Sequence, residues 1–285
     1  MPFPFLTIFT PTFNREHTLP KLYESLKNQT SKDFEWVIVD DGSTDGSENL
    51  INEYIQENKL KIRYCKQKNQ GKHIAYNTGL DFVNTPFVVT VDSDDYLIEN
   101  AVSVIKKLSQ KIVNKSDFAG FTFIRFSDAV DFDKEKYGKK EWIELNAYQW
   151  EHKGEMSFVF KSEIAKKFLF PVFEEEKFCQ EAVVILRILQ KNKVLFTDHV
   201  LAKGDYLEDG LSQNLYKRLL ANPRYAMVSF SEKLKFSKSK SEKAELAKSY
   251  WDIARKSKPK ISFWTMVSQI PIYYTFGELI RKLRK

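Results

Sequence analysis

Apolar segments that suit buried strands alternate with segments of helical period through the first hundred residues of the chain. The predicted strands cover residues 5–9, 35–39, 61–65 and 87–91, and the predicted helices cover residues 19–26, 50–55 and 72–81. Strands that alternate with helices in this way are typical of a parallel sheet with helices packed on it. The sequence therefore predicts an α/β fold.

The alternation is less regular after Asp95. We expect a helix over residues 99–113, a strand over 118–126, an inserted hairpin or loop over 127–154, a short helix capped by Ser162 and a longer helix over 178–190. Further helices are expected beyond residue 214. The predicted organisation is one domain over residues 1–215, with halves 1–98 and 99–215, followed by a helical extension over residues 216–285.

The composition excludes several classes of protein. With 285 residues, of which 42% are hydrophobic and 14% aromatic, the chain can bury a large core, so disorder describes little of it. Cys65 and Cys179 stand outside any Cys-x-x-Cys pair or histidine cluster, which predicts neither a disulfide framework nor a zinc site and favours a reducing compartment. No apolar segment reaches the length of about 20 residues that a membrane-spanning helix needs.

Positive charge is concentrated toward the C-terminal end. Residues 231–285 contain 14 Lys and Arg against 5 Asp and Glu, whereas the rest of the chain is close to neutral. Within this stretch, residues 259–285 also carry many apolar and aromatic side chains, among them Trp264 and Tyr273. Such a segment suits the headgroup boundary of an anionic membrane. The alternative is a pair of helices packed on the domain or on a second subunit.

Polar loops follow three of the predicted strands, at residues 10–15, 40–45 and 92–95. Because the carboxyl ends of parallel strands meet at one edge of an open sheet, these loops are expected to line a common ligand crevice. Asp92, Asp94 and Asp95 place three carboxylates directly after a buried strand, where like charges repel unless a positive group lies among them. Mg²⁺ or Mn²⁺, shared with substrate phosphates, fits such oxygen ligands, and the alternative is a strand end with solvated aspartates.

Four motifs occur along this part of the chain: Thr10-Pro11-Thr12-Phe13-Asn14-Arg15, Asp40-Asp41-Gly42-Ser43, an Asn-x-Gly-x-x-x-Ala-x-Asn-x-Gly pattern over residues 69–79, and Asp92-Ser93-Asp94. In this order, over residues 5–214, the chain resembles the family 2 glycosyltransferases. The resemblance implies the α/β fold called GT-A, a Rossmann-like mixed sheet flanked by helices. It also implies that residues 1–98 form a nucleotide-binding half and residues 99–215 an acceptor-binding half.

The resemblance further implies roles for individual residues. The residues expected to hold the donor are Thr10, Pro11, Thr12, Asn14, Arg15, Asp40, Asp41, Gly71, Lys72, Asp92 and Ser93. The expected metal, Mn²⁺ or Mg²⁺, would be bound directly by Asp94, with Asp92 turned toward the ribose or a metal-bound water. From the residues alone, Asp40 fits an N-cap or an Asx-turn equally well, and Asp41 fits a residue that only turns the loop. Lys72 fits a solvated lysine, although a positive charge at a helix start favours a phosphate contact.

Members of the family carry an acidic general base at the start of a helix in the second half, often as Glu-Asp and followed by an Arg. This chain has Gln180-Glu181 at the matching place, with Arg187 downstream, so Glu181 is the expected base. A carboxylate at a helix start suits removal of the proton from an acceptor hydroxyl. The alternative bases are Glu174, Glu175 and Glu176, and the alternative role for Glu181 is an interaction with the helix dipole.

Together these features predict a metal-dependent inverting glycosyltransferase of hexosyltransferase type. It would move a sugar from a nucleotide-diphosphate sugar, a UDP-sugar by family habit, to a hydroxyl of a saccharide or lipid-linked glycan in polysaccharide biosynthesis. Residues 206–212 resemble a loop that covers the diphosphate or contacts the acceptor in related enzymes, although Asp209-Gly210 is also a turn signal.

Two other functions remain open from the sequence. One is a nucleotidyltransferase, which the absence of glycine from residues 10–15 disfavours, and the other is a non-catalytic nucleotide-sugar-binding or membrane-scaffolding protein. We expect a cytoplasmic location, peripheral at the inner face of the cell membrane through residues 259–285. No nucleic-acid partner is expected.

Overall fold

The computed structural model describes residues 4–127, 139, 141–144, 155–204, 214–258 and 260–275. The described strands are β1 (Leu6–Thr12), β2 (Phe34–Asp40), β3 (Ile62–Lys66), β4 (Phe87–Thr90), β5 (Asp95–Leu97), β6 (Phe118–Phe126), β7 (Glu141–Glu144), β8 (Glu155–Lys161), β9 (Lys193–Thr197) and β10 (Val200–Gly204). The described helices are α1 (Leu19–Lys27), α2 (Ser47–Glu57), α3 (Lys72–Phe82), α4 (Ala101–Ser109), α5 (Ser162–Ala165), α6 (Ala182–Leu189), α7 (Leu215–Ala221), α8 (Pro223–Phe236), α9 (Lys240–Lys256) and α10 (Phe263–Ser268). The loop predicted at 206–212, most of the insertion predicted at 127–154 and the basic end at 276–285 lie outside the described residues.

The strands form one mixed sheet. Its path runs β3-β2-β1-β4-β8-β6-β10-β5, with β9 beside β6 and β7 beside β9. β1 pairs in parallel with β2 on one side and with β4 on the other, so the strand order reverses beside β1. In open α/β sheets, ligands bind at the carboxyl ends of the strands beside such a reversal. β8 lies between β4 and β6 and is antiparallel to both.

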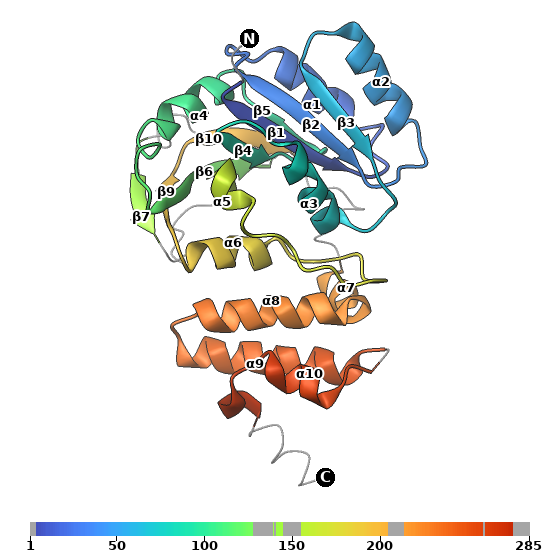
Figure 1. Cartoon of the computed structure of the whole chain (residues 1–285), viewed down its shortest axis with the longest axis vertical. Helices are drawn as coiled ribbons and strands as arrows, with labels where there is room; N and C mark the ends of the chain where they lie inside the picture. The colour runs from blue at the N-terminus through green and yellow to red at the C-terminus, as the bar shows by residue number, and fades with distance from the viewer. Residues whose placement is uncertain are drawn as a thin grey trace.

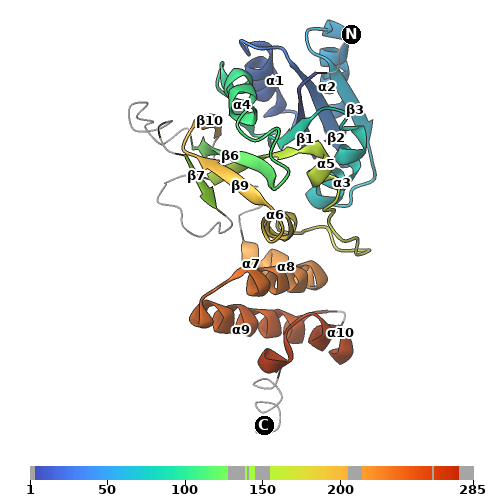
Figure 2. The same cartoon turned by 60° about the vertical axis from the view of Figure 1, so that its left-hand side comes forward.

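Helices cover both faces of this sheet (Figures 1 and 2). Helices α1, α2 and α4 pack on one face, where the largest core cluster lies, and α3, α5 and α6 pack on the other. Helix α1 turns a stripe of four buried side chains, Leu19, Leu22, Tyr23 and Leu26, toward the sheet. The ring of Tyr23 stacks on that of Tyr54 in α2, with centroids 3.7 Å apart. These contacts explain why helices form where the sequence has apolar residues at helical spacing.

The C-terminal helices form further layers below α6 (Figure 1). Tyr225 and Phe236 of α8 belong to the same core cluster as Val183 of α6. The other side of α8 packs against α9, and Ile270 completes that second cluster. Helix α8 is therefore packed between α6 and α9. The domain boundary expected at residue 215 stays a prediction.

Several predicted elements differ in extent from the observed ones. The four predicted N-terminal strands are present as β1 to β4, but α4 and α6 are shorter than the helices predicted over 99–113 and 178–190. The predicted cap at Ser162 is wrong, because Lys161 occupies the N-cap position and Ser162 is the first residue of α5. In the described part of the chain, no helix is both long and apolar enough to cross a bilayer.

Candidate active site

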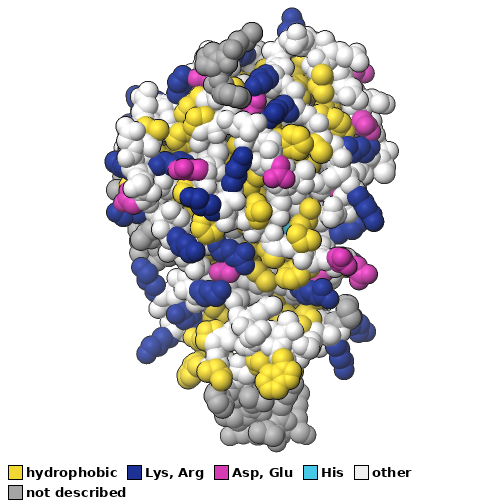
Figure 3. All heavy atoms as spheres, in the orientation of Figure 1, with side chains coloured by type: hydrophobic (Ala, Val, Ile, Leu, Met, Phe, Trp, Pro, Cys, Tyr) yellow, Lys and Arg dark blue, Asp and Glu magenta, His cyan; other side chains and the backbone are white. Residues whose placement is uncertain are grey.

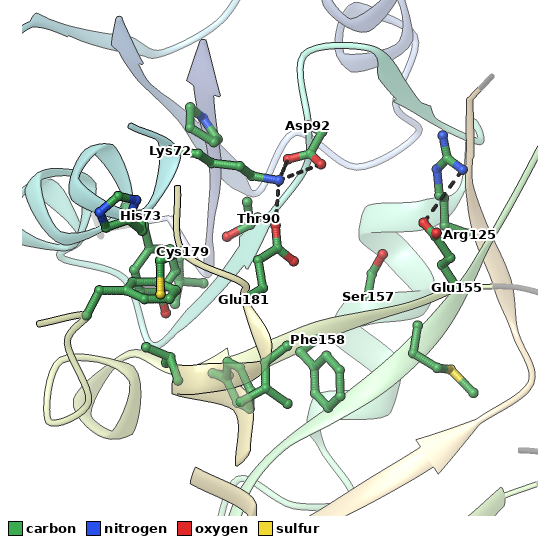
Figure 4. A pocket seen from close by; sticks show the side chains of 18 of the residues that line it. Lys72, His73, Thr90, Asp92, Arg125, Glu155, Ser157, Phe158, Cys179 and Glu181 are labelled. Atoms are coloured by element: carbon green, nitrogen blue, oxygen red, sulfur yellow. Dashed lines mark hydrogen bonds and ion pairs between the residues drawn. The ribbon is translucent and has the colours of Figure 1, made fainter. Parts of the chain in front are cut away.

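A cavity of about 140 Å³ lies at the carboxyl ends of β1 and β4 and extends along β8 (Figure 4). Its charged lining residues are Lys72, Asp92, Asp95, Arg125, Glu155 and Glu181. Its apolar lining residues include Tyr76, Phe158, Phe160, Phe170 and Val184. A cavity with an apolar wall and a few convergent polar groups is typical of a small-molecule site.

Lys72 connects the two sides of this cavity. Its Nζ lies 2.7 Å from Oδ1 and 2.7 Å from Oδ2 of Asp92, and 2.5 Å from Oε1 of Glu181 (Figure 4). Lys72 is the first residue of α3, and Glu181 is the N-cap residue of α6. Burial opposes the charged form of Lys72, but the charges of Asp92 and Glu181 outweigh it and raise the pKa of Lys72 above its ordinary range. Lys72 is therefore a cation at neutral pH.

The acidic loop after β4 carries three carboxylates in different environments. Burial raises the pKa of Asp95 to about 7, although Arg125 donates from Nε and Nη2 to its Oδ1 at 2.8 and 2.7 Å. Burial and then the charge of Asp92 raise the pKa of Asp94 above its ordinary value. Within the described residues, Asp92 and Asp95 each have a close ion pair and Asp94 has none. Asp94 is thus the carboxylate least compensated by protein cations.

These carboxylates fit a divalent ion that is shared with a ligand. Mg²⁺ and Mn²⁺ prefer oxygen donors, and Mg²⁺ typically takes only one or two carboxylates, completing its shell with water and substrate phosphates. Among the residues that the structure describes, no three His, Cys, Asp or Glu side chains are grouped so that they could hold a metal ion by themselves. Asp94, with Asp92 beside it, fits an ion held jointly with a diphosphate.

The loops after β1 and β2 hold each other in place. Asn14 has a left-handed backbone, with φ 53°, and its amide donates to Ser43 Oγ at 2.9 Å. The side-chain oxygen of Asn14 accepts from the amide of Thr44 at 2.8 Å. The amide of Arg15 donates to Ser47 Oγ at 2.9 Å. Asn14 and Arg15 therefore join the loop after β1 to the loop after β2 and to the start of α2.

Asp40 and Asp41 are both buried and both hydrogen-bonded by the protein. Asp40 accepts from the amide of Ser43, three residues further on, at 2.7 Å and from the hydroxyl of Tyr64 at 3.1 Å, so its carboxylate shapes the loop after β2. An Asx-turn would instead bond the amide two residues further on. Asp41 accepts from Gln67 Nε2 at 2.8 Å and from the amides of Gln70 and Gly71 at 2.8 and 2.7 Å. Asp41 thus holds the loop that leads into α3 in place.

Gly71 lies where this loop meets the chain before Glu181. Its φ is +96°, and a Cβ added there would lie 2.1 Å from the carbonyl oxygen of Lys177. Only glycine allows such close approach of two backbone segments. The approach brings the start of α3 against residues 177–181.

Glu181 is distinguished by its location from the three alternative bases. Glu174, Glu175 and Glu176 line a different cavity, beside Lys258 and other residues of the C-terminal segment. Glu176 also accepts hydrogen bonds from the amides of residues 224 and 225 at the start of α8, both at 3.1 Å. Only Glu181 among these four carboxylates faces Lys72 and Asp92.

Residues 7–169 match the sequence profile of glycosyl transferase family 2. The chain belongs to this family. This glycosyltransferase is 29% identical over 262 residues to the GalNAc(5)-diNAcBac-PP-undecaprenol beta-1,3-glucosyltransferase of Campylobacter jejuni, a match that covers 88% of this chain and 82% of the relative. It is also 25% identical over 206 residues to glycosyltransferase GlyG of Streptococcus pneumoniae, covering 67% of each protein.

Solved structures share its fold. S. aureus TarS residues 1–349 in complex with UDP superpose with a TM-score of 0.61 at 18% identity, over 87% of this chain and 70% of that chain. The mannosyltransferase PcManGT of Pyrobaculum calidifontis, in complex with GDP-Man and Mn²⁺, gives a TM-score of 0.59 at 13% identity, over 90% of this chain and 74% of that one. This likeness confirms the predicted GT-A fold for the glycosyltransferase, with its C-terminal helical extension.

The structure of the glycosyltransferase brings some of the predicted site residues into the cavity and leaves others around it. Pro11, Lys72, Asp92 and Glu181 line the cavity, whereas Thr10, Thr12, Asn14, Arg15, Asp40, Asp41, Gly71, Ser93 and Asp94 lie outside its lining. Within the described residues, Thr12 Oγ1 is buried without a hydrogen-bond partner, at the end of β1.

Sequence reasoning missed the ion pair of Arg125 with Asp95 and the burial of His73. Arg125 gives a signal that could have been used, because it is the single cation in the otherwise apolar segment 118–126. His73 is only 2% exposed, packs edge-on to Tyr225 with ring centroids 4.3 Å apart, and has no hydrogen-bond partner on either nitrogen within the described chain. Nothing in its sequence spacing indicates this burial.

Proposed function

We propose that this glycosyltransferase moves a hexose from a nucleotide-diphosphate sugar to a hydroxyl group with inversion, in a reaction that depends on Mn²⁺ or Mg²⁺. One observation supports this above all: a single cation, Lys72, contacts both Asp92 of the donor motif and Glu181, the expected base. Residues that are far apart in the sequence thus meet at one cavity. A donor and an acceptor bound there would lie between them.

In the proposed reaction, Glu181 accepts the proton of the acceptor hydroxyl while that oxygen attacks the anomeric carbon. The bond from this carbon to the diphosphate breaks, and its electron pair leaves with the β-phosphate oxygen. Lys72 stabilises the charge that develops on the diphosphate, because it remains a cation beside the leaving group. A divalent ion held by Asp94 and Asp92 would supply Lewis-acid stabilisation of the same charge.

The proposed donor is a UDP-sugar, and the proposed acceptor is a saccharide or a lipid-linked glycan. Structures of TarS, which is similar in fold, were determined with UDP and with UDP-GlcNAc. The Campylobacter relative is named for a glycan on undecaprenyl diphosphate. We propose that the donor contacts are made by Thr10, Pro11, Thr12, Asn14, Arg15, Asp40, Asp41, Gly71, Lys72, Asp92 and Ser93.

We also propose a peripheral position at the cytoplasmic face of the cell membrane, where a lipid-linked acceptor would be reached. Trp264, Ile272 and Tyr273 are 78%, 72% and 77% exposed, respectively, at one end of the molecule. Figure 3 shows hydrophobic side chains at this end, with Lys and Arg side chains above them. Exposed aromatic residues near cations suit a headgroup boundary.

Turnover of a panel of nucleotide sugars, with free and lipid-linked acceptors and with and without Mn²⁺, tests the proposal. We expect release of nucleoside diphosphate that requires the ion. Glu181→Gln should lower turnover by a factor on the order of 10² or more and leave the dissociation constant of the donor unchanged, since general bases contribute about this much. Glu175→Gln, at an exposed carboxylate of the other cavity, is the matched control and should retain activity.

Two results would contradict the proposal. Loss of donor binding by Glu181→Gln, with unchanged turnover of bound donor, would place Glu181 in the donor site instead of at the acceptor. Binding of a nucleotide sugar without any release of nucleoside diphosphate would favour a non-catalytic protein. Family membership already favours a glycosyltransferase over a nucleotidyltransferase.

A further inference from the structure

The segment that leads to Glu181, residues 173–181, has no helix or strand of its own. Its backbone groups are held instead by residues 222–225, which are the turn between α7 and α8 together with the first residues of α8. The side-chain oxygen of Asn222 accepts from the amides of Lys177 and Phe178 at 2.7 and 3.0 Å. The hydroxyl of Tyr225 accepts from the amide of Phe173 at 3.0 Å. These acceptors replace the backbone partners that a helix or strand would give the three amides.

Further bonds join the same segment to α8. Glu176 accepts from the amides of residues 224 and 225, as described above. Gln180, which directly precedes Glu181, accepts at Oε1 from Ser229 Oγ at 2.7 Å and from Lys233 Nζ at 3.1 Å. All of these contacts come from one short stretch, residues 222–233. The segment is thus attached to α8 along most of its length.

The same turn also reaches the donor side of the cavity. Tyr225 packs on His73, the neighbour of Lys72, with ring centroids 4.3 Å apart. The carbonyl of Lys177, whose amide is bound by Asn222, lies against Gly71 at the start of α3. A shift of residues 177–178 would therefore change the position of Lys72 as well as that of Glu181.

We infer that the α7–α8 turn positions Glu181 and Lys72 relative to each other, with Asn222 as the principal positioning residue; the inference rests on the proposed role of Glu181 as base. Within the described chain, the side-chain hydrogen bonds of Asn222 include none to a residue that lines the cavity, and Asn222 makes no side-chain cap of α8. Its Nδ2 donates to the carbonyl of Arg218 in α7 at 2.8 Å. Its bonds to residues 177 and 178 hold the segment before Glu181. Helices predicted as an appended extension thereby take part in the active site.

Three variants test this inference. Asn222→Ala removes the acceptor of both amides, whereas Asn222→Asp keeps an acceptor oxygen in the same place. Both variants lose the Nδ2 donor to the Arg218 carbonyl, so the acceptor is what distinguishes them. Met227 in α8 is fully buried in the cluster between α8 and α9, and that cluster contains no residue of segment 173–181. Met227→Ala opens a space in this cluster. It is the matched control for a general loss of stability.

We expect Asn222→Ala to lower kcat by a factor on the order of 10 to 10², because small misplacements of catalytic groups have effects of this size. The amides of residues 177 and 178 should exchange hydrogen faster in Asn222→Ala, which is a readout independent of activity. Asn222→Asp should restore most of kcat and of the protection. Met227→Ala should lower the melting temperature but leave kcat of the folded protein near the wild-type value.

The inference is overturned if Asn222→Ala keeps wild-type kcat, or if Met227→Ala lowers kcat equally. It is also overturned if the two amides stay protected in Asn222→Ala. Glu181→Gln, assayed beside these variants, separates this failure from that of the proposed function. Full activity of Glu181→Gln overturns the base assignment and the inference together, whereas an inactive Glu181→Gln with an unchanged Asn222→Ala overturns the inference alone.

Discussion

Asp94 differs from its neighbours because no described protein cation lies in close contact with it, and burial together with Asp92 raises its pKa. We predict that Asp94→Ala abolishes Mn²⁺-dependent transfer, because the metal ion is expected to stabilise the transition state by several kcal/mol. This energy corresponds to a decrease of more than about a hundredfold in rate. Removing one of three repelling carboxylates should not lower the melting temperature. Titration of activity with Mn²⁺ measures this, with the exposed Asp81→Ala on α3 as the control. Near wild-type turnover in Asp94→Ala would contradict the metal assignment.

His73 is a buried base whose charged form is disfavoured. Burial lowers the pKa of His73 to about 4, compared with about 6.5 in an unfolded chain. Between these values the unfolded state binds more protons than the folded state, so the free energy of unfolding falls as the pH falls. The stability that His73 contributes is fully present above about pH 6.5 and is lost progressively toward pH 4.

We predict that His73→Phe reduces this pH dependence. Phenylalanine keeps an aromatic ring beside Phe170 and Tyr225 but cannot take up a proton. Between pH 6 and 5 the wild type should lose up to about 1.4 kcal/mol more stability per pH unit than the variant. Urea unfolding at several pH values measures the two slopes. Equal slopes in the two proteins would show that His73 does not stay neutral in the folded state.

At the scale of elements, the start of α3 depends on the close approach at Gly71. We predict that Gly71→Ala lowers the free energy of unfolding by about 1–3 kcal/mol, because its φ of +96° strains any other residue and its Cβ would meet the Lys177 carbonyl oxygen. Activity should fall too, since the same loop carries Lys72. Gly46→Ala is the control, because its Cβ would meet only the movable carboxylate of Glu16. Similar losses in both variants would argue against a special role for Gly71.

The elements that were predicted well are those whose own residue pattern is sufficient to show whether they form a helix or a strand. All seven residues of β2 are buried, and its apolar residues 36–39 were sufficient evidence for that strand. Strand β8 was not predicted, because its first residues, Glu155-Met156-Ser157, are partly polar and exposed and it is paired by two strands distant in sequence. Helix α6 begins at Ala182 and not at 178, since residues 177 and 178 bond to Asn222 instead of forming a helical turn.

The candidate site, like the fold, was predictable in part. The strand pattern placed the loop with Asp92 at a crevice, and the family resemblance assigned roles to Lys72 and Glu181. The structure brings the three side chains together at Lys72. The hydrogen bonds of Asp41 could not be predicted, because its three donors lie on a loop whose position depends on tertiary packing. The same holds for the bonds from α8 to segment 173–181. No local pattern relates residue 222 to residue 177.

For the molecule as a whole, the exposed apolar end offers a test of membrane binding. Ile261 and Ile270 pack on the α8–α9 cluster, so cutting off the C-terminal segment would uncover that core and confuse the result. We predict that the double variant Trp264→Ser, Tyr273→Ser binds anionic vesicles more weakly without a lower melting temperature. The wild type should also dissociate as salt increases, since each surface cation contributes about 1 kcal/mol of screened attraction.

The matched control is Val172→Ser, at a side chain that is 64% exposed but lies in a different part of the chain. It should bind vesicles as the wild type does. Vesicle sedimentation at low and high salt, with anionic and neutral lipids, measures all three proteins. Unchanged binding of the double variant would indicate that this end packs on another protein surface instead.

The position of β8 in the middle of the sheet has a consequence for how the chain is synthesised. Strand β4 ends at Thr90, but its second neighbour in the sheet is not complete until Lys161. At about 5–20 residues per second, a ribosome needs several seconds to make the intervening chain. During that time the nascent protein carries β4 with one unpaired edge, which is a template for association with other chains. Translation that stalls before β8 should therefore yield aggregating fragments, and chaperone contacts should concentrate on nascent chains of this length.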